Sequence, residues 1–240
     1  VQNHLLQVLS IVAMEPPASL RPADIRDEKM KVLRALQPIT LADAKERTVR
    51  GRYDAGAVGG EAVKGFLEEA GFQDADNTET FVGLKASINN WRWAGVPFYL
   101  RTGKRMKARS SEIAVVFKDL GHTIFEGDEA RHRNILSIRL QPNEGMDLQV
   151  TIKEPGPGGM RLIDVPLDMT FAEALGPDGG QNVDAYERLI MDIIRGNQTL
   201  FMRGDEVEAA WAWTDPIIAG WQARGDVPKP YEAASKGPTD

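Results

Sequence analysis

Residues 96–109 read VPFYLRTGKRMKAR and place a strand directly before a group of positive charges. The bulky residues 96–100, bounded by Gly95 and Gly103, predict a strand. The chain breaks at Thr102 and Gly103, and five cations lie around the break: Arg101, Lys104, Arg105, Lys107 and Arg109. A second strand is predicted at residues 112–118. The pattern therefore predicts a basic loop between two buried strands.

This basic loop belongs to an acidic chain, whose formal net charge is -6. A cluster of positive side chains in a chain of negative net charge is suited to binding an anion such as a phosphate or a carboxylate. The alternative is that the charges only solvate a surface loop, as most charge runs do. The residues alone leave both interpretations open.

The composition is that of an ordinary globular chain of 240 residues, 42% hydrophobic and 27% charged. No apolar run approaches the roughly 18 residues of a membrane span, and the acidic balance argues against general nucleic-acid binding. Cysteine is absent, which excludes thiol catalysis and fits a cytoplasmic protein. The three histidines are not spaced as a zinc ligand set. Because Val1 runs straight into a helical pattern, we expect a piece of a longer protein.

Helical patterns lie at both ends of the chain. Residues 5–14 predict a largely buried helix, and residues 22–36 predict a second one that ends before Pro38. Towards the end, residues 184–196 predict a helix capped by Asp184 and Gly196. Residues 205–213 predict another, capped by Asp205 and kinked or interrupted by Pro216. Residues 228–231 should be extended, and residues 237–240 should form a tail.

The middle of the chain is predicted to consist of strands. Residues 51–71 look like a surface loop with one helical turn near residues 60–67. Besides the two strands already described, we expect strands at 48–53, 80–88, 135–140, 147–153 and 162–169. Short turns between successive strands mean antiparallel pairing. The expected fold class is α+β, with a large, mostly antiparallel sheet and helices packed on one face.

Four residues are candidates for a site. His4 stands at the start of a buried helix, where an imidazole can act as a general base, although a packing or surface histidine is the alternative. Lys104 and Arg109 could hold an anion from two sides. Gln141 could bind sugar hydroxyls, or it could be a turn residue that faces water. The glycines of 56–60 lack the strand before and the helix after them that a dinucleotide site needs.

Six short motifs occur in order and resemble one family. They are QNHLLQ at 2–7, RDEK at 26–29, WAGVPF at 93–98, LRTGK at 100–104, QPNE at 141–144 and DAYERL at 184–189. Together they resemble the C-terminal domain of bacterial-type glucose-6-phosphate dehydrogenases. The resemblance covers essentially the whole chain, so residues 1–240 are expected to be one substrate-binding and dimerisation domain.

The resemblance implies a role for each candidate. His4 is similar to the family's catalytic base, which takes the proton from the C1 hydroxyl while hydride leaves for NADP+. Lys104 resembles a lysine that contacts the substrate, and Arg109 stands where the family binds the sugar phosphate. Gln141 matches a glutamine of the substrate site. The implied reaction oxidises D-glucose 6-phosphate to 6-phosphogluconolactone in the oxidative pentose phosphate pathway, within a homodimer formed through the open sheet face.

The chain also departs from the family. It lacks the glycine-rich coenzyme fingerprint and the segment that supplies the carboxylate orienting the base. We therefore expect NADP to be bound mainly by a separate N-terminal domain, and this chain alone to be inactive. Asp147 and Gln149 stand where animal members with a second, structural NADP+ have a tyrosine and a lysine, which argues against that second site. The alternative function is a stand-alone sugar-phosphate-binding or oligomerisation domain without catalysis.

Overall fold

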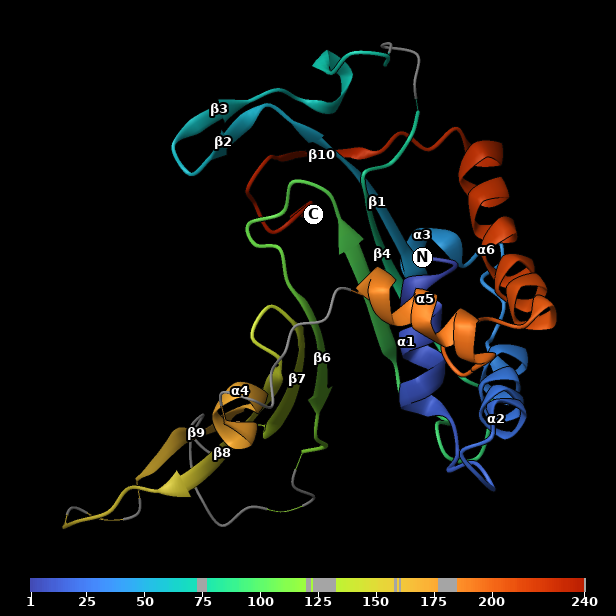
Figure 1. Ribbon diagram of the computed structural model, residues 1–240. Coiled ribbons are helices and arrows are strands. Elements are labelled where there is room, and N and C mark those ends of the chain that lie inside the picture. Colours follow the sequence, from blue (N-terminus) through green and yellow to red (C-terminus); the bar gives the residue numbers. More distant parts are fainter. Residues whose placement is uncertain are drawn as a thin grey trace. The chain divides into compact units, whose positions relative to one another are not determined.

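The computed structural model describes residues 1–72, 77–119, 122, 133–157, 159, 161–176 and 185–239. The chain divides into two compact units. The first unit combines Val1–Lys107 with Asp184–Asp240, and the second is Ala108–Val183. Figure 1 shows their helices and strands along the chain.

The helices of the first unit come from both ends of the chain. They are α1 His4–Ala13, α2 Pro22–Ala35, α3 Ala44–Arg47, α5 Ala185–Arg195 and α6 Gly204–Arg224, with a short 3-10 turn, η1, at Phe66–Glu68. The two predicted N-terminal helices are confirmed. In α1, Leu6, Leu9 and Ala13 are buried, whereas Ile11 is exposed. The cap that Asp184 was expected to provide lies outside the described residues.

Helix α6 differs from its prediction at both ends. It does not stop near Pro216 but continues to Arg224, because the buried Trp213, Ile217 and Trp221 hold both sides of the proline against the core. Its N-cap is Arg203 rather than the predicted Asp205. The Arg203 backbone amide donates to a carboxylate oxygen of Glu206 at 2.7 Å.

The main sheet of the first unit has the order β10-β1-β4-β5. Its strands are β1 Thr48–Asp54, β4 Phe81–Ala86, β5 Phe98–Gly103 and β10 Lys229–Glu232. The pairs β1–β4 and β4–β5 are antiparallel, whereas β10 lies parallel to β1. The predicted surface loop at residues 51–71 is wrong in part, since β2 Gly56–Val58 and β3 Glu61–Val63 form a hairpin there.

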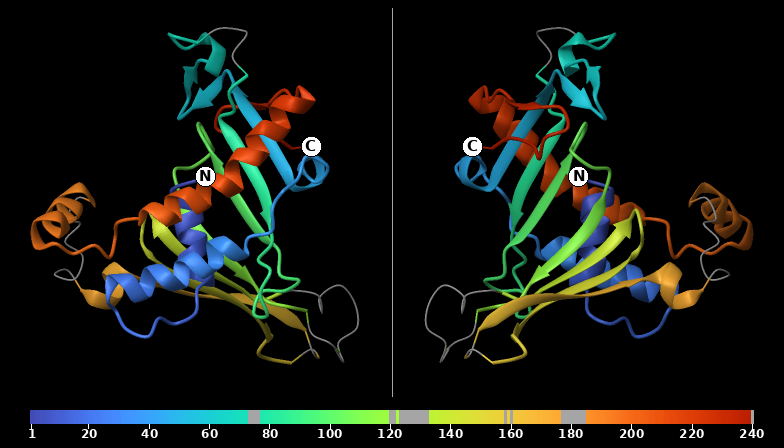
Figure 2. Two further views of the ribbon diagram at one scale, coloured as in Figure 1. Left: turned by 90° about the vertical axis from the view of Figure 1, so that its right-hand side faces the viewer. Right: turned by 90° about the vertical axis from the view of Figure 1, so that its left-hand side faces the viewer.

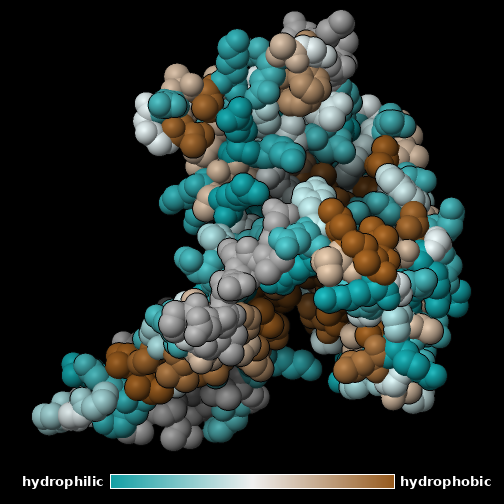
Figure 3. All heavy atoms as spheres, in the orientation of Figure 1, coloured by the Kyte–Doolittle hydropathy of each residue, from teal (hydrophilic) through white to brown (hydrophobic). Residues whose placement is uncertain are grey.

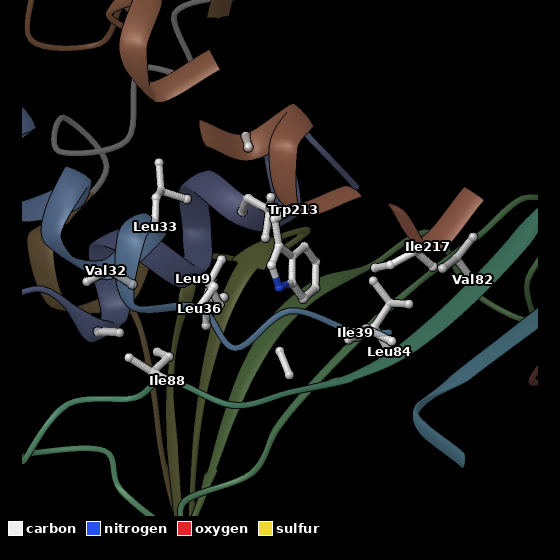
Figure 4. Packing of buried hydrophobic residues seen from close by; sticks show 14 of the residues in the cluster. Leu9, Val32, Leu33, Leu36, Ile39, Val82, Leu84, Ile88, Trp213 and Ile217 are labelled. Carbon is white, nitrogen blue, oxygen red and sulfur yellow. The ribbon is translucent and has the colours of Figure 1, made fainter. Parts of the chain in front are cut away.

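The core of the first unit lies between this sheet and α1, α2 and α6. Val82, Leu84, Ala86 and Ile88 are all buried and form the inward face of the predicted strand region 80–88. Figure 4 shows the Trp213 ring among apolar side chains from α1, α2 and β4. The two views of Figure 2 show α6 lying across the sheet. Alternating burial and helix cover therefore explain why this face is closed to water.

Helices α2 and α6 are also joined by ion pairs. Lys29 Nζ lies 2.9 Å from Glu206 Oε1, and both side chains are almost completely buried. At the exposed end of the contact, Arg203 lies 2.7 Å from Asp27 and 2.6 Å from Asp205. Hydrogen bonds from Arg203 hold the pKa of Asp205 below its usual range. The helix–helix contact thus combines one buried ion pair with an exposed network.

The second unit is a four-stranded antiparallel sheet of order β6-β7-β8-β9. Its strands are β6 Ser111–Val116, β7 Ile135–Gln141, β8 Gly145–Lys153 and β9 Leu162–Thr170, followed by the short helix α4 Phe171–Leu175. The predicted hairpin of 135–140 with 147–153 is confirmed. The α+β class with antiparallel pairing is confirmed too, with the strands divided among three sheets.

One face of this second sheet is apolar. Met146, Leu148, Val150 and Ile152 alternate along β8 and stand opposite four apolar residues of β9, which are Met169, Leu167, Val165 and Ile163. Several of these side chains are exposed, and Figure 3 shows hydrophobic side chains gathered over β9. Strand β6 is likewise mostly exposed, so the prediction that the basic loop is followed by a buried strand is wrong within the described residues.

Candidate functional site

A pocket of about 440 Å³ opens in the first unit beside the start of α1. Gln2, Asn3 and Lys104 are among the polar residues that line it, and Trp211 and Trp221 are among the apolar ones. The pocket therefore brings the chain just before His4 together with the lysine that follows β5.

His4 is the first residue of α1, and its side chain is exposed. Asn3 is the N-cap, and its carbonyl oxygen accepts from the Gln7 backbone amide at 3.0 Å. Because the helix starts directly after the residues that line the pocket, its first turn fixes where the His4 backbone stands. The exposed His4 side chain is open to solvent, but His4 itself is not among the residues that line the pocket.

Lys104 follows β5 directly. The strand extends to Gly103, later than predicted, so Arg101 belongs to the strand and the basic loop begins at Lys104. The Lys104 backbone amide donates to the Thr80 carbonyl at 2.8 Å, and its own carbonyl accepts from the Tyr231 hydroxyl at 2.7 Å. The Lys104 side chain is exposed. An exposed ammonium group on a backbone that is held at two points is suited to an anion.

The loop after Lys104 is held by the C-terminal segment. Ala234 N–H donates to the Arg105 carbonyl, and Lys107 N–H donates to the Ser235 carbonyl, each at 2.8 Å. Gly237, with φ of 97°, packs so closely on Phe81 that a Cβ would lie 2.7 Å from the ring. The prediction of a tail at residues 237–240 is therefore wrong for its described part. Tyr231 and Thr80 are the residues that the sequence analysis missed, because no local motif marks them.

One cation of the basic loop, Arg105, forms an ion pair within the protein. Arg105 lies 3.2 Å from the Glu69 carboxylate, which also accepts from the Tyr53 hydroxyl at 2.8 Å. The hydrogen bond from Tyr53, which has the larger effect, and the one from Arg105 hold the pKa of Glu69 below its usual range. Glu69 is therefore an ionised partner for Arg105 within the protein. This ion pair separates Arg105 in role from Lys104.

Arg109 and Gln141 belong to the second unit, whereas His4 and Lys104 belong to the first. Both side chains are exposed. Gln141 is the last residue of β7 rather than part of the turn, and it is paired with Ser111, two residues after Arg109. The structure therefore brings Arg109 and Gln141 to the same end of the β6–β7 pair.

The glycine-rich stretch does not form the turn typical of a dinucleotide site. The glycines at 56–60 lie in the β2–β3 hairpin, without the strand–turn–helix that receives a pyrophosphate. Of the other histidines, His122 is exposed and His132 lies outside the described residues. Across the described ranges, no three metal-ligating side chains gather, and no helix is long and apolar enough to cross a membrane.

Comparison with known proteins gives consistent matches along the chain. The family model described as "Glucose-6-phosphate dehydrogenase, C-terminal domain" matches residues 1–240. Glucose-6-phosphate 1-dehydrogenase of Rhizobium meliloti (strain 1021) is 58% identical over 240 residues, and that of Mycolicibacterium smegmatis is 53% identical over 241. Each match covers 100% of this chain and 48% of the relative. The chain thus spans about half the length of these curated relatives.

Two solved structures are similar over 99% of this chain, each at 33% identity. One is described as glucose-6-phosphate dehydrogenase in complex with its substrate glucose-6-phosphate, with a TM-score of 0.86 and 47% of that chain covered. The other is glucose-6-phosphate 1-dehydrogenase from Mycobacterium avium, with a TM-score of 0.78 and 46% covered. Because the family model matches residues 1–240, this chain belongs to the glucose-6-phosphate dehydrogenase C-terminal domain family.

Proposed function

We propose that this chain is the substrate-binding and dimerisation part of an NADP-dependent glucose-6-phosphate 1-dehydrogenase. The whole enzyme would oxidise D-glucose 6-phosphate to 6-phosphogluconolactone in the oxidative pentose phosphate pathway. The observation that carries this proposal is the pocket lined by Lys104 and by Gln2 and Asn3, the two residues that precede His4. The match to glucose-6-phosphate dehydrogenases over the whole chain supports the choice of substrate.

His4 is the proposed base. Oxidation at C1 of the sugar removes a hydride from carbon and a proton from the C1 hydroxyl. The imidazole would accept that proton, and its exposure at the head of α1 supports this role. NADP+ would accept the hydride. We propose that the rest of the enzyme binds NADP+, because the chain spans about half of its relatives' length and its glycines at 56–60 form a hairpin.

Lys104, Arg109 and Gln141 are the proposed substrate contacts. Lys104 and Arg109 are five residues apart, so the extended chain keeps their Cα atoms within about 18 Å of each other. Two cations on one loop are suited to the dianionic phosphate of a sugar phosphate. Gln141 can donate to or accept from a sugar hydroxyl through its amide. Arg105 is not part of this set, because it pairs with Glu69.

We further propose that residues 1–240 act as one domain that forms a homodimer through the apolar face of the second sheet. An exposed apolar face rather than a charged one is typical of obligate interfaces. Cytoplasmic localisation remains part of the proposal, and a chain without cysteine agrees with it.

The direct test is turnover. The intact enzyme, with this chain joined to the remaining half of its relatives' length, should reduce NADP+ when glucose 6-phosphate is added. The 240-residue chain alone should not, because its described residues offer no dinucleotide fold. The absorbance of the reduced coenzyme reports both results. Substrate binding by the intact protein without any turnover would instead favour a stand-alone sugar-phosphate-binding function.

Lys104 provides a second test of the same proposal. The Lys104→Ala variant should raise KM for glucose 6-phosphate about 10- to 100-fold, the loss expected for a charge-assisted hydrogen bond of about 1.5–3 kcal/mol. Lys107→Ala is the matched control, since Lys107 is also exposed on the loop. It should leave KM within about two-fold. Equal effects of both variants would show that the loop acts only through its overall charge.

A further inference from the structure

The Tyr231 hydroxyl lies in a short chain of hydrogen bonds that ends on Lys104. The Tyr53 backbone amide donates to Thr80 Oγ1 at 3.0 Å, and Thr80 Oγ1 lies 3.0 Å from Tyr231 Oη. The Tyr231 hydroxyl in turn donates to the Lys104 carbonyl at 2.7 Å. Each hydroxyl can accept one bond and donate the next, and the Tyr231 hydroxyl lies closer to the Lys104 carbonyl than to its other acceptor, the Thr80 carbonyl at 3.3 Å.

Tyr231 itself is well anchored. It lies on β10, which pairs with β1 so that Tyr231 stands opposite Tyr53. Its ring is 5% exposed and makes edge contacts with Phe81 and Tyr53, at centroid distances of 5.8 and 6.3 Å. Burial raises the pKa of Tyr231, so the hydroxyl keeps the proton that it donates. A rigid ring therefore presents a fixed donor to the Lys104 backbone.

Lys104 needs such support because it stands where the strand ends. The next residue, Arg105, has a left-handed backbone with φ of 50°, which is uncommon for a residue other than glycine. After Gly103, the bond that the Lys104 amide donates to Thr80 and the bond that the Lys104 carbonyl accepts from Tyr231 fix the Lys104 backbone. Beyond it, the C-terminal segment holds the loop at Arg105 and Lys107. In Figure 1 this segment (red) lies beside the loop after β5 (green).

We propose that Tyr231 is a positioning residue for substrate binding, because its hydroxyl holds the Lys104 backbone so that the Lys104 ammonium points at the bound sugar phosphate. This inference rests on the proposed function of Lys104. It gives the C-terminal strand a part in substrate affinity, although Tyr231 does not itself touch the substrate. The Tyr231 ring packs the core, and the hydroxyl sets the geometry of the loop.

The test is Tyr231→Phe in the intact enzyme, since this change removes the hydroxyl and keeps the ring. KM for glucose 6-phosphate should rise about 3- to 10-fold, the effect expected for one lost neutral hydrogen bond. The values of kcat and of KM for NADP+ should stay within about two-fold, because neither depends on the Lys104 geometry. Thr80→Val, which removes the hydroxyl next to Tyr231 in the chain of bonds, should shift KM for glucose 6-phosphate in the same direction by less.

A double-mutant cycle separates positioning from a general structural role. In a Lys104→Ala background, adding Tyr231→Phe should change KM for glucose 6-phosphate less than two-fold, because the group that Tyr231 positions is gone. Tyr53→Phe is the matched control: this buried tyrosine belongs to the same aromatic cluster, but its hydroxyl bonds Glu69. It should leave KM for glucose 6-phosphate unchanged.

Three results would overturn the inference. If Lys104→Ala raises KM for glucose 6-phosphate and Tyr231→Phe does not, the positioning role is wrong and the proposed function stands. If Tyr231→Phe lowers kcat and weakens both substrates alike, its role is general stability. If Lys104→Ala itself leaves KM unchanged, the proposed role of Lys104 fails and the inference fails with it.

Discussion

Replacing His4 by asparagine should lower kcat of the intact enzyme about 100- to 10,000-fold, the usual contribution of a positioned general base. Asparagine keeps a polar side chain at the head of α1 and cannot accept the C1 hydroxyl proton in the working pH range. KM for glucose 6-phosphate should change only a few-fold, because the phosphate is held by other groups. Steady-state kinetics with saturating NADP+ separate the two constants.

The control for this prediction is His122→Asn. His122 is also exposed, but it belongs to the second compact unit, whereas His4 follows directly on Gln2 and Asn3, which line the pocket of the first unit. Its replacement should leave kcat within about two-fold. A His4→Asn enzyme with nearly full kcat, or one whose loss lies entirely in KM, would show that His4 binds the substrate rather than accepting its proton.

Local patterns predicted most of the helices and strands. The strand at 80–88 was predictable because Val82, Leu84, Ala86 and Ile88 alternate with other residues, and period-two burial is a property of consecutive residues. Proline and turn residues likewise gave the hairpin of β7 and β8. Secondary structure that is determined by residues close together in the chain can therefore be predicted from those residues.

Structure that depends on distant partners was not predictable in the same way. The β10 strand pairs with β1, about 180 residues earlier in the chain, and nothing near residues 229–232 specifies that partner. The same is true of the C-terminal segment that holds the loop after Lys104. From local composition, the end of this segment was predicted to be a tail. The hairpin β2–β3 was missed because its glycine-rich residues lack the alternation that marks a strand.

The candidate site was predictable only in part. Residue type and position suggested His4 and Lys104, but only folding places Lys104 beside Gln2 and Asn3 in one pocket. Charge alone could not distinguish Lys104 from Arg105, since the Glu69 partner of Arg105 lies 36 residues away. Tyr231 could not be suspected at all, because its contribution is a single hydroxyl directed at a backbone carbonyl.

Lys29 lies on α2 and forms the buried ion pair that joins this helix to α6. Lys29 is 5% exposed and Glu206 is fully buried, with 2.9 Å between Lys29 Nζ and Glu206 Oε1. Glu206 Oε2 accepts from the Arg203 amide, whereas Oε1 has no hydrogen bond of good geometry among the described residues. The ionic contact with Lys29 is therefore what compensates the charge at Oε1.

Lys29→Met should consequently lower the free energy of unfolding by about 3–5 kcal/mol, since it leaves a buried carboxylate without its cation. Methionine fills a similar volume, so the loss reports the charge and not a cavity. The shift of the urea midpoint, followed by the fluorescence of the buried Trp213 and Trp221, measures it. Lys31→Met, on the same helix but with an exposed side chain, should cost less than about 1 kcal/mol.

The double variant Lys29→Met with Glu206→Gln tests the cause of that loss. Glutamine is neutral and keeps an oxygen that can cap α6 by accepting from Arg203, so no uncompensated charge remains in the core. Because replacing both members of a buried ion pair is often nearly neutral, the double variant should be more stable than Lys29→Met alone. A double variant as unstable as the sum of the single changes would mean that Lys29 contributes through packing of its methylene chain. In that case the contact between α2 and α6 would be an apolar one, and the ion pair would add nothing to it.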